Sequence, residues 1–492
     1  MASTKKHRIV YALLTASLAA CGGGNGGDTA SATAPAPAPS PAPPVRGSDT
    51  QPPVASLTAP VNFSSGLTGA LTLTASATDD VGVTAVEFQV DGVAVGSVLT
   101  NPPYASSVDT AAYPAGQHIV RVQARDAAGN ASPWASATVA FGGTRTQPAG
   151  FTRNEGWATG LSGATAIAQA PDGRFFIAQQ GGALRVVKNG ALLAAPFTQL
   201  AVDSSGERGL IGVALHPNFA SNGYVYLHYT SPEGGSHNRV SRFTASGDVA
   251  AAASEAKLID LPNLSTATNH NGGAIHFGID GKLYVGVGEN ANRAQASDLT
   301  RVFGKLLRFN DDGSIPTDNP FYATSIGQAR AVWAYGLRNP FTFAVQPGTG
   351  RIHINDVGEN TWEEIDLGAA GANYGWPASE GPDNPATGLT APLFTYKHGA
   401  AAPAGSGAGG FFTGFAIAGG SFYPASGPFP TAYQGNYFFA DFIGRFIARI
   451  DLTNNATYAF GSVTGTPVDM MTGADGALYV LTRDSVVRFN GP

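Results

Sequence analysis

Cysteine is almost missing from this chain of 492 residues, which contains a single one at position 21. One cysteine excludes a disulfide scaffold and any zinc or iron–sulfur site built on several thiolates. Charged residues are also scarce, at 13%, and the formal net charge is -6. This balance makes nucleic acid a poor candidate partner. No apolar run is long enough to predict a helix that spans a membrane.

Glycine and proline are abundant by contrast, with 64 and 33 residues. Both residue types mark turns and interrupt long helices. Hydrophobic residues make up 43% of the chain, which excludes global disorder. The composition therefore favours many short strands joined by turns, and the length accommodates about two to four domains.

The first 21 residues have the pattern of an export signal. Basic residues lie within the first eight positions, an apolar run follows over residues 9–20, and the run ends in LAACG at residues 18–22. This ending resembles the bacterial lipoprotein signal, so we expect Cys21 to carry the lipid; an ordinary secretory signal with an incidental cysteine is the alternative. The resemblance implies a cell-envelope protein at the outer membrane of a Gram-negative bacterium, held there by acyl chains alone.

Residues 22–51 begin with GGGNGG and continue with alternating alanine and proline. Such a segment cannot bury apolar surface, so we expect a disordered linker that holds the folded part away from the lipid.

Residues 52–142 have the alternation of a small β module. Period-two patterns recur over residues 71–76, 83–90 and 118–125, with Gly, Asn and Pro turn signals between them. About seven short strands in such a length predict an Ig-like β-sandwich. The segment resembles the bacterial Ig-like domains of secreted proteins and contains no candidate catalytic group.

Residues 150–492 contain a loose repeat in which an Asp-Gly or Asn-Gly turn, or a similar glycine turn, precedes an aromatic or aliphatic strand. The six copies begin at Pro171, Pro217, Ile279, Pro347, Gln434 and Ala474. Six copies predict a six-bladed β-propeller in which each copy is an inner strand of a four-stranded blade. The predicted fold class is therefore all-β, with the propeller preceded by the Ig-like sandwich. The uneven spacing of the copies implies insertions that build a site on one face.

Four segments of the propeller region concentrate polar residues among glycines. They are SGERGLIGVALHPNF at 205–219, TNHNGGAIHFG with GVGENAN at 268–292, WAYGLRNPF at 333–341, and NDVGENTWEEI with GANYGWP at 355–377. Together they resemble the glucose/sorbosone dehydrogenase family, whose best-known members are soluble six-bladed propellers that use pyrroloquinoline quinone (PQQ) and calcium. The resemblance covers nearly all of residues 155–490 and keeps the order of the family's motifs.

The resemblance implies oxidation of a sugar C1 hydroxyl to a lactone, in which a base removes a proton while the cofactor accepts a hydride. His270 is then the general base, a role that suits histidine. Arg338 lies at the quinone oxygens, where its charge stabilises the reduced cofactor, and Asn339 is a cofactor contact. We expect the glycines after His270 to let a flat ligand approach the backbone. A histidine bonded to a neighbouring blade and an arginine that pins loops together are the alternatives.

Calcium takes oxygen ligands, including backbone carbonyls. The resemblance aligns Gly358 and Glu359 with a pair whose carbonyls hold the calcium that polarises the quinone. Glu359 stands where the family often has proline, and its carboxylate is a further candidate ligand. Glu363, Glu364 and Tyr374 align with a structural calcium region; solvated acids at a strand end are the alternative.

The chain departs from the PQQ enzymes in its positive charges. PQQ carries three carboxylates, which call for arginine or lysine, and the PQQ enzymes have an Arg-x-Arg pair in the last blade. The matching stretch at residues 465–476 contains no arginine. Glu207 replaces a cofactor-binding glutamine, Arg208 follows it, and Asn269 replaces the acid before the histidine. Lys397, in a Gly/Ala-rich insertion, is the candidate replacement cation, and all four are predicted cofactor contacts.

Three functions remain open from the residues. The first is a PQQ- and calcium-dependent sugar dehydrogenase, anchored by lipid, that passes electrons to a periplasmic or membrane acceptor. The second is a non-catalytic propeller that binds glycans or surface proteins, since the DVGEN-TWEEI pattern also occurs in Hedgehog-interacting-protein-like propellers. The third is a calcium-dependent lactonase, for which Glu207, Asn269 and Glu359 supply part of a metal-binding ring. We predict the first.

Overall fold

The computed structural model describes residues 49–60, 64, 67–113, 116–141, 147–148, 150–382, 387–398 and 414–492. The predicted signal with Cys21 lies outside the described residues, as does the predicted linker up to residue 48. In the part of the chain that is described, no helix combines the length and the apolar character needed to traverse a bilayer.

The N-terminal module is a sandwich of two antiparallel sheets, with strand orders β1-β2-β5 and β4-β3-β6-β7. Leu73, Phe88 and Val120 from the two sheets share one buried core, as period-two strands require. The elements are β1 (Val54–Ala59), β2 (Ala70–Thr78), β3 (Val83–Val90), β4 (Val93–Leu99), β5 (Tyr104–Asp109), the 3-10 helix η1 (Thr110–Ala112), β6 (Gly116–Asp126) and β7 (Ala135–Phe141).

The remaining strands form six blades. Blade 1 contains β9 (Ala164–Gln169), β10 (Phe175–Gln179), β11 (Ala183–Lys188), β12 (Ala191–Leu192) and β13 (Thr198–Gln199). Blade 2 contains β14 (Leu210–Leu215), α1 (Phe219–Asn222), β15 (Tyr224–Ser231), β16 (His237–Ser246), β17 (Val249–Ala250) and β18 (Ala256–Asn263). Blade 3 contains β19 (Ile275–Phe277), β20 (Leu283–Val287), α2 (Ala294–Ser297), β21 (Lys305–Phe309), η2 (Gly327–Ala331) and β22 (Val332–Tyr335).

Blade 4 contains β23 (Pro340–Val345), β24 (Ile352–Asp356), β25 (Trp362–Gly368) and β26 (Phe394–Lys397). Blade 5 contains β27 (Ile417–Phe422), η3 (Thr431–Tyr433), β28 (Tyr437–Asp441), β29 (Phe446–Asp451) and β30 (Ala456–Ser462). Blade 6 contains β31 (Pro467–Thr472), β32 (Leu478–Thr482), β33 (Val486–Asn490) and β8 (Thr152–Ala158).

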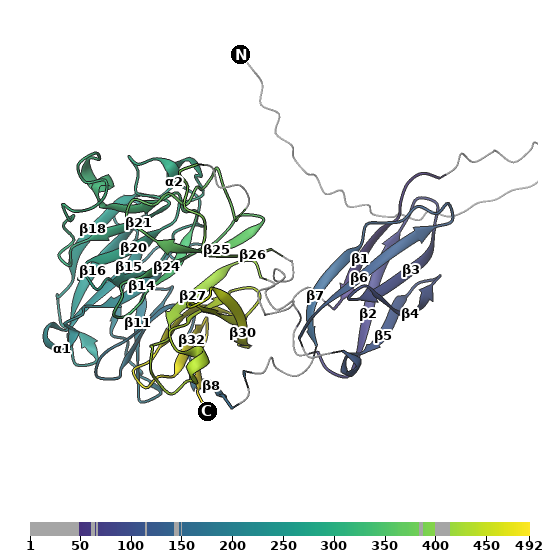
Figure 1. The fold of residues 1–492 in the computed structure, drawn as a ribbon, viewed down its shortest axis with the longest axis horizontal. Coiled ribbons are helices and arrows are strands. Elements are labelled where there is room, and N and C mark those ends of the chain that lie inside the picture. Colours follow the sequence, from purple (N-terminus) through teal and green to yellow (C-terminus); the bar gives the residue numbers. More distant parts are fainter. Residues whose placement is uncertain are drawn as a thin grey trace, which may run out of the picture. The chain divides into compact units, whose positions relative to one another are not determined.

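The six blades close into a propeller. The innermost strands β9, β14, β19, β23, β27 and β31 contact one another in that order, and β31 returns to β9. The ring is locked by β8, which precedes blade 1 in the chain yet pairs with β33 of blade 6, with Asn154 opposite Arg488. In Figure 1 the C-terminus accordingly lies beside β8. The predicted six-bladed propeller is confirmed.

Each copy of the sequence repeat forms the second strand of its blade, counted from the centre. Gly173, Gly281 and Gly476 of the Asp-Gly turns have φ values of 88°, 71° and 73°, a region that glycine adopts without strain. The aspartate of the turn accepts a hydrogen bond two residues on, as Asp280 does from the N–H of Lys282 at 3.1 Å. The turn between the first and second strands lies on one face of the ring. The second strands therefore end on the other face.

Candidate active site

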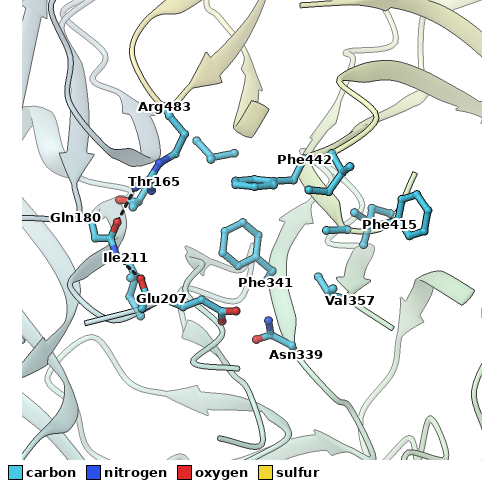
Figure 2. Close-up of a pocket in the computed structure, with 15 residues that line it drawn as sticks. Thr165, Gln180, Glu207, Ile211, Asn339, Phe341, Val357, Phe415, Phe442 and Arg483 are labelled. Carbon is cyan, nitrogen blue, oxygen red and sulfur yellow. Dashed lines mark hydrogen bonds between the residues drawn. The ribbon is translucent and has the colours of Figure 1, made fainter. Parts of the chain in front are cut away.

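A cavity of about 570 Å³ lies where the second strands end (Figure 2). The residue that directly follows the second strand lines this cavity in four blades, as Gln180, Val357, Phe442 and Arg483. The second residue of the innermost strand lines it in four blades, as Thr165, Ile211, Phe341 and Val468. The cavity is therefore built by equivalent positions of different blades, far apart in the sequence.

The walls of this cavity are mainly apolar, with charge at two places. Phe341, Phe442 and other hydrophobic side chains make up most of its surface. Among the described residues that line it, the charged ones are Arg483 and Glu207. Figure 2 shows Arg483 beside Thr165 and Gln180 on one side, and Glu207 near Asn339 on another. The cavity is thus mainly apolar, with one positive and one negative side chain in its wall.

His270 stands beside the cavity in a strained loop before β19. Its φ of 56° lies in the left-handed region, which few residues other than glycine adopt. Its N–H donates to Glu207 Oε2 at 2.7 Å, and its Nδ1 lies 2.5 Å from Glu289 Oε1. Among the described residues nothing bonds to its Nε2. The contacts at the backbone and at Nδ1 therefore hold the ring while Nε2 is left to exchange a proton.

Glu289 is a site residue that the sequence analysis did not single out, although it lies in the GVGENAN segment. Its side chain is 1% exposed, and its Oε2 has no hydrogen-bond partner among the described residues. Gly288 makes this approach possible, because a Cβ there would lie 2.3 Å from the carbonyl oxygen of His270. Its position, as an acid in a glycine-rich segment just after a second strand, could have identified Glu289 from the sequence.

The glycines after His270 allow a close approach of neighbouring backbone. A Cβ on Gly272 would lie 2.5 Å from the carbonyl oxygen of Gly286, and one on Gly273 would lie 3.1 Å from that of Ile211. These glycines therefore serve packing, and the expectation that they admit a ligand stays a prediction. They let backbone from neighbouring strands pack against the loop.

Arg338 and Asn339 are held by Asp356, which ends the second strand of blade 4. Their N–H groups donate to its carboxylate at 2.9 and 2.6 Å. Asn339 lines the cavity, and its Oδ1 accepts from the N–H of Gly272 at 2.9 Å. Arg338 lies next to the lining, where its Nη1 donates to the carbonyl of Val357 at 2.9 Å. The structure thus brings both residues to the same edge of the cavity.

Arg208 and Asn269 do not line the cavity. The guanidinium of Arg208 is buried and donates to Asp203 at 2.6 Å and to the carbonyls of Ser265 and Ala267 at 2.6 and 2.9 Å. Arg208 therefore connects the loop before blade 2 with the loop before blade 3. The prediction that it contacts the cofactor is corrected. Asn269 is exposed on the loop next to His270.

Lys397 also lies away from the cavity. It ends β26, the strand of blade 4 furthest from the centre, and pairs in register with Trp362. Its side chain is exposed, with Nζ 5.8 Å from the centre of the Trp362 ring. The expectation that Lys397 supplies the missing cation is therefore corrected, because strand order places it at the outer edge of the blade.

The predicted calcium region divides into two environments. Successive side chains of β25 point to opposite faces, so Glu363 and Glu364 separate. Glu363 is buried and accepts from His398 Nε2 at 2.6 Å and from the N–H of Ile417 at 2.8 Å. Its carboxylate is used to join blades 4 and 5. The expectation that Glu363 and Glu364 share one metal region is therefore corrected.

Glu364 instead joins two acids that were not predicted. It lies opposite Asp356 in the ladder, and Asp366 follows two residues later on the same face. A carboxylate oxygen of each lies within 4.8 Å of the others. Burial raises the pKa of Asp356 to about 6, and burial with the charge of Asp356 raises that of Glu364 to about 8. We call Asp356, Glu364 and Asp366 the acid cluster.

Asp366 is the member of the acid cluster that lacks any partner. It is 0% exposed, and neither carboxylate oxygen has a hydrogen bond among the described residues. Tyr374 lies nearby, since burial and then the charge of Asp366 raise the pKa of its hydroxyl. That hydroxyl already donates to the carbonyl of Leu367 at 2.8 Å and accepts from the N–H of Ala369 at 3.2 Å. The oxygens of the acid cluster, rather than this hydroxyl, suit a hard cation.

The turn with Gly358 and Glu359 is organised by Glu380. Glu380 Oε1 accepts from the N–H groups of the four residues 359–362 at 2.8 to 3.2 Å. Burial acts to raise the pKa of Glu380, but these N–H groups hold it below its ordinary value. Among the described residues no donor reaches the carbonyl oxygens of Gly358 and Glu359. The Glu359 side chain pairs with Arg293 at 3.2 Å.

The glucose/sorbosone dehydrogenase family model matches residues 161–489. The chain belongs to this family. A bacterial Ig domain model matches residues 53–122, in agreement with the N-terminal sandwich. The family member is thus an oxidoreductase of the sugar dehydrogenase class, and the first of the three functions considered above is confirmed at this level.

Its relatives include enzymes of known structure. The aldose sugar dehydrogenase YliI of Escherichia coli K12 is 31% identical over 341 residues, which are 65% of this chain and 87% of the relative. The soluble aldose sugar dehydrogenase of E. coli in the apo form is 28% identical with a TM-score of 0.60, covering 70% of this chain and 100% of its own. The PQQ-bound aldose sugar dehydrogenase of Streptomyces coelicolor is 25% identical with a TM-score of 0.56, covering 70% and 99%.

Proposed function

We propose that this family member oxidises the C1 hydroxyl of an aldose or related sugar to a lactone, using PQQ and calcium. The observation that carries the proposal is the His270–Glu289 pair, held at 2.5 Å beside a mainly apolar cavity. A base fixed in this way is what removal of a hydroxyl proton requires.

The residues around the cavity fit a planar, anionic quinone. Phe341 and Phe442 offer apolar faces, Asn339 offers an amide, and Arg483 offers a positive charge that no described carboxylate neutralises. When bound, PQQ supplies the hydride acceptor. Arg338, beside the cavity edge, would place its charge near the negative charge that develops there.

The proton passes to His270. With Nδ1–H held by Glu289 Oε1, the lone pair on Nε2 is the acceptor for the C1 hydroxyl proton. The carboxylate of Glu289 then stabilises the imidazolium that forms. Glu207 holds the backbone N–H of His270 and lines the cavity, so it also lies within reach of a sugar hydroxyl.

A Glu289→Gln variant is expected to lower kcat by about 10- to 100-fold, less than loss of the base itself. The amide cannot stabilise the imidazolium and also favours the wrong tautomer when its NH₂ group faces Nδ1. KM and PQQ affinity should stay near those of the wild type, because Glu289 does not line the cavity. Steady-state kinetics and a PQQ titration check this, and an unchanged kcat would remove Glu289 from its positioning role.

Calcium fits the acid cluster. Three buried carboxylates within 4.8 Å, one of them without a hydrogen bond to any described residue, form an oxygen set that a divalent cation neutralises. The carbonyls of Gly358 and Glu359 are a second candidate ligand pair, supported by the resemblance and by the observation that no donor among the described residues reaches them.

The location is proposed from the sequence. The LAACG ending and the single cysteine support lipid attachment at Cys21, and with it a place in the cell envelope at the outer membrane of a Gram-negative cell. The electrons would then pass to a periplasmic or membrane acceptor. Mass spectrometry of the mature N-terminus tests this, and an unmodified cysteine would contradict it.

The proposed reaction is tested by reconstitution. The purified protein, mixed with PQQ and calcium, should reduce an artificial electron-accepting dye in the presence of an aldose. Omission of PQQ, or chelation of calcium, should abolish turnover, and product analysis should find the lactone. A panel of aldoses that gives no turnover, together with no change in PQQ absorbance on mixing, would overturn the proposal.

A further inference from the structure

Arg483 is a cation in the cavity wall for which the described residues supply no counter-ion. It directly follows β32, is half-buried, and lines the cavity. Its Nη2 donates to Gln180 Oε1 at 2.6 Å, and its Nη1 lies 3.4 Å from the carbonyl oxygen of Ala164. No described carboxylate comes within ion-pair distance, and burial lowers the pKa of its guanidinium. A desolvated charge in this position is stabilised by an anion that enters the cavity.

Of the other basic residues near this face, Arg338 lies next to the lining, where it donates to the carbonyl of Val357, and the rest are already engaged. Arg208 pairs with Asp203 and Arg293 pairs with Glu359. Arg445, in the turn after β28, donates to the carbonyl of Thr464 and does not line the cavity. Among the described residues, Arg483 is therefore the positive charge that the cavity wall offers.

The surroundings hold Arg483 in place. Gln180 Nε2 donates to the carbonyls of Gly206 and Arg208 at 2.6 and 2.9 Å, which fixes Gln180 Oε1 toward Arg483. Val468, in the stretch where the sequence lacks the expected arginine pair, lines the same cavity. Arg483, in the turn that follows the next strand of the same blade, thus supplies a positive charge in place of the missing arginine pair.

The two charged side chains of the cavity wall have opposite signs. Figure 2 shows Arg483 and Gln180 on one side and Glu207 with Asn339 on another. A carboxylate is favoured beside the guanidinium, which presents paired N–H donors, and is disfavoured beside Glu207. A planar ligand with carboxylates at one edge therefore has a preferred orientation.

We propose that Arg483 binds a carboxylate of the cofactor and thereby sets its orientation, with the carboxylate edge toward blades 6 and 1 and the reacting edge toward Arg338 and Asn339. This inference rests on the proposed function, since it takes PQQ as the ligand. The family resemblance places the residues that bind the cofactor's carboxylates in the stretch 465–476 of the last blade. The proposal assigns this role to Arg483, which lies in the same blade but outside that stretch.

The test is a binding titration rather than an activity assay. PQQ and its trimethyl ester are titrated in the presence of calcium into the wild type, Arg483→Gln and Arg483→Lys, and binding is followed by protein fluorescence. Arg483→Gln should weaken PQQ binding by about 10- to 100-fold, as expected for loss of a hydrogen bond between charged groups. Arg483→Lys, which keeps the charge, should lose less. Arg445→Gln, an arginine of a neighbouring turn, is the matched control and should bind as the wild type does.

The ester separates a direct contact from a structural role. If Arg483 meets a carboxylate, the wild type prefers the acid over the ester and Arg483→Gln loses that preference. If Arg483 acts only by holding Gln180, both ligands weaken equally and the inference is overturned. Wild-type binding of PQQ with an unchanged Arg483→Gln affinity would overturn the inference and leave the proposed function standing. A wild type that binds no PQQ would overturn both. Thermal melting checks that the variants fold. If Arg483→Gln unfolds, PQQ and its ester are compared in Arg483→Lys instead.

Discussion

A His270→Asn variant is expected to lose about 100- to 10,000-fold in kcat/KM, the contribution of a general base. Asparagine is a better replacement than alanine, because it tolerates the left-handed backbone that His270 adopts at a φ of 56°. The N–H bond to Glu207 can then persist, so the loop keeps its shape while the imidazole is removed. Steady-state kinetics with an aldose, after reconstitution with PQQ and calcium, measures the loss.

The control for this variant is His216→Asn. His216 lies between β14 and β15, at the opposite end of blade 2 from the cavity, where its Nδ1 accepts from the N–H of Asn218. This control should leave kcat/KM near the wild-type value, and His270→Asn should bind PQQ with nearly unchanged affinity. Full activity of His270→Asn would exclude His270 as the base.

An Asp366→Asn variant is expected to be less stable than the wild type with calcium but not without it. With calcium at about 100 times its Kd, the wild type gains about 2.7 kcal/mol, and the variant loses most of this gain because a ligand charge is gone. Without calcium, the variant is as stable as the wild type or more stable. The amide replaces a buried carboxylate to which no described residue donates a hydrogen bond.

Thermal melting with added calcium and with a chelator measures both effects. Glu363→Gln is the matched control, since Glu363 is the neighbour of Glu364 but faces His398 and Ile417. Glu363→Gln should lower the melting temperature by the same amount under both conditions. A full calcium response in Asp366→Asn would exclude the acid cluster as the calcium site.

The fold could be predicted because its signals are local. Glycine turns, three of them Asp-Gly, and short apolar strands recur six times, and each recurrence forms the second strand of a blade. The alternation over residues 71–125 likewise predicts the sandwich strands. Turn chemistry and side-chain period act within a few residues, so one sequence contains enough information to place them.

The site was predicted in part. His270 and Asn339 each lie in a recognisable motif, and the structure brings these two motifs together. Arg338 precedes Asn339 in the same motif. Their partners Glu289 and Asp356 lie in segments that were noted as polar and glycine-rich, but no local pattern says which carboxylate faces inward. The position directly after each second strand, which is Arg483 in blade 6, was a usable signal.

The sequence by itself determined the blade count, the Ig-like sandwich, the family motifs and the loop that carries His270. These depend on periodicity, turns and short contiguous motifs. Only the tertiary structure decided which charges share a space. Strand order sends Lys397 to the outer edge of blade 4, and strand alternation separates Glu363 from Glu364. Closure of the ring brings Arg483 of the last blade beside Gln180 of the first. These outcomes depend on contacts between residues far apart in the chain, and electrostatic interactions follow distance in space rather than distance in sequence.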